Sequence, residues 1–217
     1  MIDPFRLAIA VIPLAAYLLV IGLLNARRRP FLTSGGCDLT ALGLSISGLL
    51  FVGPMELFRP ESATRSFGNY IWLFLLFFYW LGLLLSVLLA RPRLVVYNIS
   101  AEELHPMLAQ MAAQLDQSAR WAGNQLSMPT IGVHLHIDRL DLMRNVSLVS
   151  SGGRQSIEGW RRVSRELSIA LVKVRVKVNP RAIGFVLLSA TLMTIAVAHL
   201  WLHQAALMQG IHEVFAF

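Results

Sequence analysis

Four long stretches with almost no charged side chains constrain the fold of this chain more than any other feature. They are rich in Leu, Ile, Val and Phe. A helix needs about 20 mainly apolar residues to cross the hydrocarbon core of a bilayer. The sequence therefore predicts an α-helical integral membrane protein with four transmembrane helices, at about residues 7–25, 39–58, 70–90 and 181–203.

The composition of the 217 residues supports this class. Apolar residues make up 56% and charged residues 14%, whereas soluble domains carry about 25% charged residues. The apolar content excludes a disordered chain. The single Cys37 has no partner within the chain, which excludes a disulfide scaffold.

The second apolar stretch is the least typical of the four. It is diluted by small residues, namely Gly43, Ser45, Ser47, Gly48 and Gly53. Small residues let membrane helices approach each other closely, so we expect this helix inside the bundle. The alternative is a re-entrant or interfacial segment, because the stretch is short for a span.

The first apolar stretch resembles a signal peptide but is followed by Arg27, Arg28 and Arg29. A cleaved signal has its positive charge before the apolar stretch and a small-residue cleavage site after it. We therefore expect a retained helix.

The distribution of Lys and Arg predicts the orientation. Sixteen of the nineteen lie in residues 27–38 and 91–181, and the other three are Arg6, Arg59 and Arg65. Cytoplasmic loops carry the excess of positive charge. We expect a multi-pass protein of the bacterial plasma (inner) membrane, with both termini outside and residues 91–181 in the cytoplasm. Cys37 would then lie in a reducing compartment.

The chain divides by composition into four parts. Residues 1–90 form a membrane region, 91–180 a cytoplasmic α+β domain, 181–203 the fourth span, and 204–217 a short amphipathic C-terminal tail. The domain is thus inserted between the third and fourth spans, and about 90 residues can bury a modest core.

Residues 93–99 read as a strand, and 119–150 contain short alternating segments typical of two or three antiparallel strands. Helices are predicted at 101–116, after a capping box of Ser100 and Glu103, and at 156–171. The two helices should cover one face of the sheet. The predicted buried residues are Val95, Leu104, Leu108, Met111, Leu115, Trp121, Val133, Leu135, Val146, Leu148, Trp160, Val163 and Leu167.

Residues 172–178 are ambiguous between strand and helix. Val alternates with charged residues, which favours a strand. The apolar series of the preceding helix also continues through Val174 and Val178, which favours a longer helix. We favour the strand.

Histidine pairs are candidates for metal binding. His199 and His203 share one helical face, and His212 would be a third ligand. The alternative is a pair of interfacial rings beside Trp201, and no metal is predicted. His134 and His136 share one face of a strand, which is typical of the solvated side of a sheet.

A loop at Gly152, Gly153 and Arg154 joins a strand to a helix, where backbone N–H groups can bind an anion. It lacks the remaining residues of a phosphate-binding motif, so the alternative is a simple turn.

The sequence shows no catalytic set, and no catalytic residue or cofactor is predicted. The four apolar stretches contain no Asp, Glu, Lys or Arg of the kind that mark proton and ion pathways, which argues against a pump or coupled transporter. The leading hypothesis is a non-enzymatic membrane protein whose cytoplasmic domain binds a protein partner or assembles a complex, including a homo-oligomer. The alternatives are a small passive channel or transporter and, third, a membrane-bound enzyme.

Residues 91–181 carry thirteen bases and seven acids, and the bases cluster next to the spans. Basic residues near an anionic leaflet each contribute about 1 kcal/mol of binding. We therefore expect contact with anionic lipid head groups rather than with nucleic acid, for which no reading motif is present. The predicted contact residues are Arg91, Arg93, Lys173, Arg175, Lys177 and Arg181.

Overall fold

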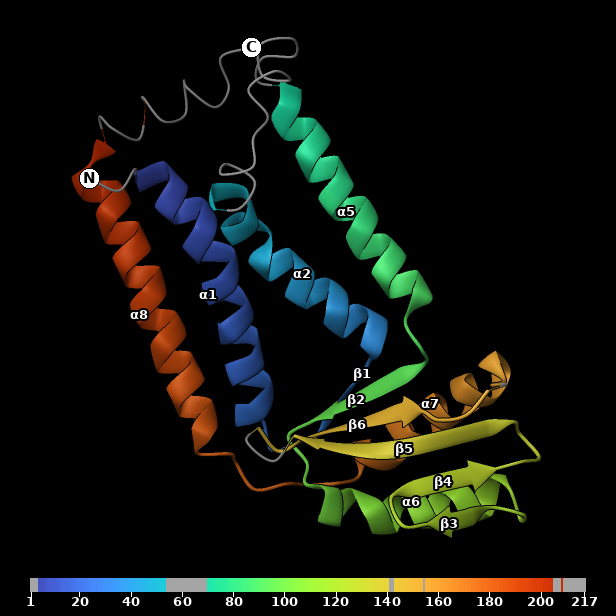
Figure 1. Ribbon diagram of the computed structural model, residues 1–217. Coiled ribbons are helices and arrows are strands. Elements are labelled where there is room, and N and C mark those ends of the chain that lie inside the picture. The colour runs from blue at the N-terminus through green and yellow to red at the C-terminus, as the bar shows by residue number, and fades with distance from the viewer. Residues whose placement is uncertain (1–3, 54–69, 141–142, 154, 205–207, 209–217) are drawn as a thin grey trace. The chain divides into compact units, whose positions relative to one another are not determined.

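The computed structural model describes residues 4–53, 70–140, 143–153, 155–204 and 208. These residues contain six helices and one antiparallel sheet of six strands (Figure 1). The chain forms two compact units. The helical unit comprises residues 1–20, 39–89 and 185–217, and the sheet unit comprises residues 21–38 and 90–184.

Four helices are long and apolar enough to cross a membrane: α1 (Pro4–Ala26), α2 (Gly35–Val52), α5 (Ile71–Leu89) and α8 (Arg181–Leu202). They correspond to the four predicted spans. Helix α2 begins four residues earlier than predicted, and residues 54–58 of that predicted span lie outside the described residues. So does nearly all of the predicted tail at 204–217.

Small residues bring the helices of the helical unit together. A Cβ atom added at Gly48 of α2 would lie 1.9 Å from the carbonyl oxygen of Ile9 in α1. The hydroxyl of Tyr79 in α5 donates to the carbonyl of Gly43 in α2 across 2.6 Å. Helix α2 therefore lies between α1 and α5, as expected from its glycines, and Gly48 is required for this close packing.

The sheet unit is built on strands in the order β1-β2-β6-β5-β4-β3, with every neighbouring pair antiparallel. The predicted antiparallel sheet is confirmed, but residues 119–150 supply four strands rather than two or three. The strands are β1 (Phe31–Ser34), β2 (Arg93–Tyr97), β3 (Arg120–Ala122), β4 (Gln125–Met128), β5 (Val133–Leu140) and β6 (Asn145–Ser150).

Strand β1 was not predicted, because it lies within residues 27–38, which were expected to form a loop. It pairs with β2 in a register that sets Leu32 opposite Val96 and Thr33 opposite Val95. Its four residues are too few to show an alternating pattern. The sheet therefore begins in the segment after the first apolar helix and not only after the third.

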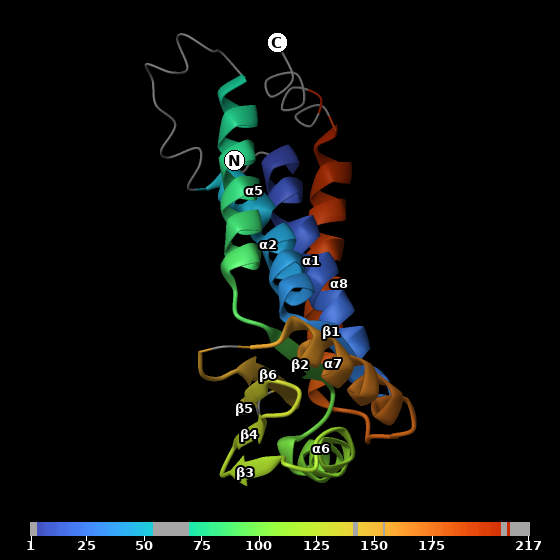
Figure 2. The same ribbon diagram turned by 90° about the vertical axis from the view of Figure 1, so that its right-hand side faces the viewer.

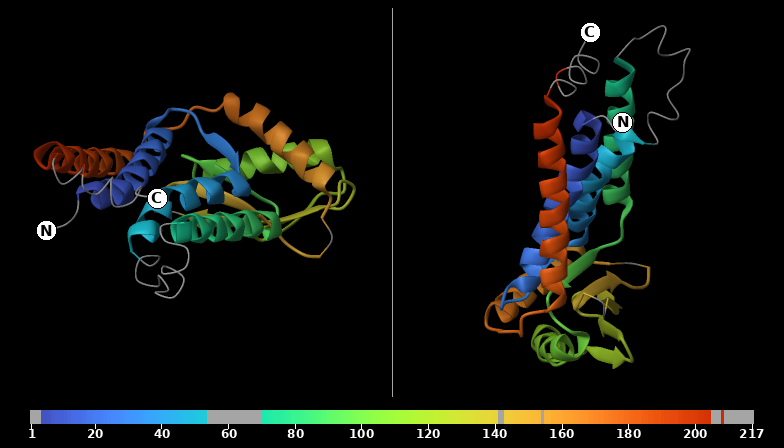
Figure 3. Two further views of the ribbon diagram at one scale, coloured as in Figure 1. Left: turned by 90° about the horizontal axis from the view of Figure 1, so that it is seen from above. Right: turned by 90° about the vertical axis from the view of Figure 1, so that its left-hand side faces the viewer.

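Helices α6 (Ala101–Leu115) and α7 (Ile157–Val172) lie side by side on one face of the sheet (Figures 2 and 3). Their apolar stripes and the inward residues of the strands form one core. Ten of the thirteen residues predicted to be buried belong to this core, and Leu115 and Trp121 are half-buried against it. Val95 is also buried, but it does not belong to this core, to which β2 contributes Leu94 and Val96. His134 and His136 are half-buried on β5, at positions that alternate with the core residues Val133, Leu135 and Ile137.

The preference for a strand at 172–178 is wrong, and so is the helical alternative. Helix α7 ends at Val172, and the following residues form neither element. The amide of Val176 donates to the carbonyl of Arg28 across 3.1 Å, and Val176 is buried in the core. The alternation of Val with charged residues therefore reflects the burial of Val176 and the partial burial of Val174, not the hydrogen bonds of a strand.

Candidate functional site

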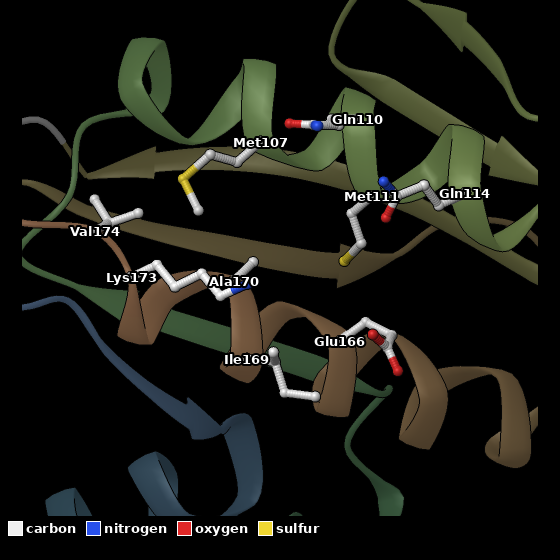
Figure 4. Close-up of a pocket in the computed structure, with 9 residues that line it drawn as sticks. All are labelled: Met107, Gln110, Met111, Gln114, Glu166, Ile169, Ala170, Lys173 and Val174. Atoms are coloured by element: carbon white, nitrogen blue, oxygen red, sulfur yellow. The ribbon is translucent and has the colours of Figure 1, made fainter.

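A groove of about 460 Å³ runs between α6 and α7 on the sheet unit (Figure 4). Cavities of this size accept a small ligand or a few side chains of a partner. The residues that line it are Met107, Gln110, Met111 and Gln114 of α6, Glu166, Ile169 and Ala170 of α7, and Lys173 and Val174, which follow α7.

The floor of the groove is apolar. Met107 and Met111 point from α6 toward α7, where Ala170 and Val174 form the opposite wall (Figure 4). Ile169 is 50% exposed beside them. Methionine is flexible and polarizable, and surfaces that contain it adapt to different apolar partners. This floor is suited to apolar side chains rather than to a charged substrate.

The rim of the groove is polar and carries both signs of charge. Gln110 and Gln114 lie on the α6 side, and Glu166 and Lys173 lie on the other side. Lys173 lies seven positions after Glu166, which corresponds to about 10 Å along a helix. The two charges therefore lie toward opposite ends of this wall.

The first turn of α6 is held by several hydrogen bonds. The hydroxyl of Ser100 accepts from the amide of Glu103, and the carboxylate of Glu103 accepts from the amide of Ser100. Arg144 donates to Glu103 across 2.9 Å. The pKa of Glu102 is lowered, first by its own backbone N–H and then by the Ser100 hydroxyl and the charge of Arg139. This anchoring fixes the α6 wall of the groove.

The start of α7 is anchored to the sheet by Gln155. Its side-chain nitrogen donates to the carbonyls of His134 and Ser151, and its oxygen accepts from the indole N–H of Trp160 at 3.0 Å. The hydroxyl of Ser156 caps the helix by accepting from the amide of Gly159. Both walls of the groove are therefore carried by helices with fixed ends.

The predicted anion-binding loop lies between β6 and α7. Gly152 adopts a φ of +90°, which favours glycine, and Gly152 and Gly153 are exposed. Arg154 lies outside the described residues. The loop is separate from the α6–α7 groove, and its anion binding remains a prediction.

His199 and His203 stack with ring centroids 4.5 Å apart on α8 and the residue after it. The third proposed ligand, His212, lies outside the described residues. Among the residues that the structure describes, no three His, Cys, Asp or Glu side chains gather into a possible metal site.

The six predicted lipid-contact residues differ in their contacts and in their exposure. Arg93 donates to Asp38 across 2.7 Å, and Lys173 lines the groove. Arg91, Arg175, Lys177 and Arg181 are exposed. The structure therefore gives Arg93 a carboxylate partner within the sheet unit.

The groove itself was missed in the sequence analysis. One signal was present: Ile169 is apolar but lies outside the stripe formed by Trp160, Val163 and Leu167. Apolar residues outside the core stripe of an amphipathic helix indicate a second contact surface.

No protein-family model, curated protein sequence or solved structure matches this chain. We therefore infer its function from the residues and geometry of the two units.

Proposed function

We propose that this chain is a multi-pass protein of the bacterial plasma membrane whose sheet unit faces the cytoplasm. Four helices long and apolar enough to span a bilayer support the membrane location. The excess of Lys and Arg in residues 27–38 and 91–181 supports the orientation, with both termini outside.

We propose further that the sheet unit is a non-enzymatic module that docks a partner protein during assembly of a membrane complex. The observation that carries this proposal is the α6–α7 groove, with its apolar floor and its polar rim. Interfaces commonly have this anatomy, because apolar contacts at the centre exclude water and the polar rim gives orientation. Two helical walls suit a helical ligand laid between them.

The rim restricts the chemistry of the partner. A helix that lies along α7 would meet Lys173 at one end and Glu166 at the other. Favourable pairing requires an acidic residue and a basic residue about two turns apart on the partner helix. Between them, apolar side chains would contact Met107, Met111 and Ile169.

Ile169 is the exposed apolar residue of the α7 wall. It is 50% exposed and lines the groove. The partner would therefore bury it.

Site-specific photocrosslinking in the full-length protein, in native membranes, tests the docking. A photoreactive residue at position 169 should crosslink one protein, and the crosslinked peptide should be an amphipathic segment with an acid and a base about two turns apart. Position 157 is the matched control, because Ile157 lies on the same helix and is 68% exposed but does not line the groove. It should give no such product.

The substitution Lys173→Glu should reduce the yield of this product severalfold, because the acid of the partner would then face a like charge. Equal crosslinking at 157 and 169, or crosslinking at 169 to lipid alone, would contradict docking in the groove.

We also propose that the basic residues next to the spans contact anionic head groups. Because Arg93 is paired with Asp38 and Lys173 lines the groove, we assign this role mainly to Arg91, Arg175 and Lys177. Screening by salt should weaken the contact.

A further inference from the structure

A second cavity, of about 350 Å³, lies between β1 and α7. Strand β1 contributes Leu32, Thr33 and Ser34 to its wall. Helix α7 contributes two arginines, Arg161 and Arg165, and two serines, Ser164 and Ser168. Six of these seven side chains are cationic or carry a hydroxyl group, so this cavity differs in chemistry from the groove.

The spacing of the four α7 residues places them on one stripe of the helix. Positions 161, 164, 165 and 168 follow the intervals of three and four residues that align side chains on one face. Positions 166, 169, 170 and 173, which line the groove, fall on the other side of the core stripe. The cavity and the groove are therefore separate sites flanking the same helix.

The two arginines of the cavity have no carboxylate partner among the described residues. The ion pairs found there join Arg93 to Asp38, Arg139 to Glu102 and Arg144 to Glu103. Two like charges at an interval of four residues destabilise a helix unless something compensates them. The pair at 161 and 165 therefore provides two guanidinium groups for an external anion.

Hydroxyl groups complete the donor set. The Ser34 hydroxyl oxygen accepts from the amide of Cys37, so its own proton is free to donate to a ligand. The Ser168 hydroxyl already donates its proton to the carbonyl of Arg165 across 2.7 Å, so it is not one of these donors. Thr33 and Ser164 offer further hydroxyls in the same cavity.

This donor set matches a phosphate group better than a carboxylate. Guanidinium groups form charge-assisted, often bidentate hydrogen bonds to phosphate oxygens. One arginine already satisfies a carboxylate with two oxygens, whereas a terminal phosphate has three oxygens and up to two charges. Two arginines with adjacent hydroxyls fit the larger charge and the third oxygen.

We propose that the cavity between β1 and α7 binds a phosphate group through Arg161 and Arg165, with the hydroxyls of Thr33, Ser34 and Ser164 as additional donors. Two sources supply this chemistry: the head group of an anionic phospholipid and a free phosphate compound. A lipid source is favoured because β1 follows a candidate membrane span closely in sequence. Only four residues, three of them arginines, separate the end of α1 at Ala26 from Phe31.

The test uses the full-length protein purified in detergent and has two arms. In the first arm, inorganic phosphate is titrated at constant ionic strength with chloride as the balancing anion, and the shift in thermal unfolding is measured. In the second arm, native mass spectrometry compares retention of short-chain phosphatidic acid with that of phosphatidylcholine. The expected result is a saturable upward shift with phosphate, preferential retention of phosphatidic acid, or both.

The double variant Arg161→Gln/Arg165→Gln should weaken the response about tenfold or more, because both charge-assisted contacts are lost. The control Arg162→Gln/Arg120→Gln removes the same net charge outside the cavity and should change the response less than about twofold. Arg161 and Arg165 are exposed, so unfolding of the unliganded double variant should match that of the parent protein.

A response to inorganic phosphate alone would assign the site to a soluble phosphate compound. A response to phosphatidic acid alone would assign it to a lipid head group. No response in either arm, or an equal loss in the two double variants, would overturn the proposal.

Discussion

The guanidinium group of Arg93 on β2 donates to the carboxylate of Asp38 across 2.7 Å, at the start of α2. The same carboxylate accepts from the hydroxyl of Tyr97, four residues further along β2. Asp38 follows β1 in the chain, and its carboxylate is bound by two residues of β2. These contacts therefore hold the end of the β1 segment against β2, the strand that pairs with β1. This explains how β1, a strand of only four residues, stays paired at the edge of the sheet.

We predict that Asp38→Ala lowers the free energy of unfolding by about 1–2 kcal/mol, because it leaves the Tyr97 hydroxyl and the Arg93 guanidinium without this acceptor. The figure is modest because the Arg93 side chain is 38% exposed. Denaturant unfolding of the full-length protein measures the change. The control Asp138→Ala, at an exposed position of β5, should cost less than about 0.5 kcal/mol. Equal losses for the two variants would contradict the role of Asp38.

Asp116 should make the sheet unit sensitive to acid. Burial raises the pKa of its carboxyl group, but hydrogen bonds from Ser118 and Thr130 outweigh this effect and lower the pKa to about 2. An unfolded aspartate titrates near about 3.9. The stabilising contribution is thus fully present above about pH 4 and is lost as the pH falls toward about 2.

The substitution Asp116→Asn should therefore remove part of the acid dependence of unfolding between about pH 4 and pH 2. Thermal unfolding of the two proteins at a series of pH values measures this. Their difference in stability should be largest at neutral pH and shrink in acid. A difference that does not change with pH would show that the charge of Asp116 contributes nothing.

Gly159 should be required for the packing of α7 on the sheet. A Cβ atom at this position would lie 2.3 Å from the carbonyl oxygen of Ile131 and 2.6 Å from Val133. We predict that Gly159→Ala destabilises the protein by about 1–3 kcal/mol, although alanine favours helix formation. Gly153→Ala is the control, because no described atom lies within 4 Å of that added Cβ. If both variants unfold at the same denaturant concentration as the parent, α7 is not in this close contact.

The two helices of the sheet unit could be predicted because their signals are local. The capping box of Ser100 and Glu103 forms as expected, and the apolar stripe of α7 is buried as its spacing indicates. Short-range hydrogen bonds and the helical period depend on residues within a few positions of each other.

Strand β1 and the segment after α7 could not be predicted, because their structure depends on distant residues. Leu32 finds its partner Val96 more than sixty residues away. Val176 finds a single backbone acceptor at Arg28 instead of a strand ladder. Alternation indicates which side chains are buried but does not establish that a neighbouring strand is present.

The two cavities escaped sequence analysis for the same reason. Met107 and Ile169 look like ordinary apolar positions until α6 and α7 are placed side by side. Arg161 and Arg165 look like a solvated helix face until β1 is placed opposite them. Each site needs the tertiary arrangement of two elements.

Cys37 provides the most direct test of the central claim, that this is a membrane protein whose sheet unit faces the cytoplasm. It is the single cysteine of the chain, it belongs to the sheet unit, and its side chain is exposed. The measurement is labelling with a membrane-impermeant maleimide in intact cells and in inside-out vesicles, with detergent-treated membranes as the reference for full reactivity. A second reporter, Gln117→Cys in a Cys37→Ser background, probes an exposed position of the same unit.

The account predicts that both cysteines stay unlabelled in intact cells and react in inside-out vesicles to the extent seen in detergent. Labelling of both cysteines in intact cells would place the sheet unit outside the cell and contradict the account.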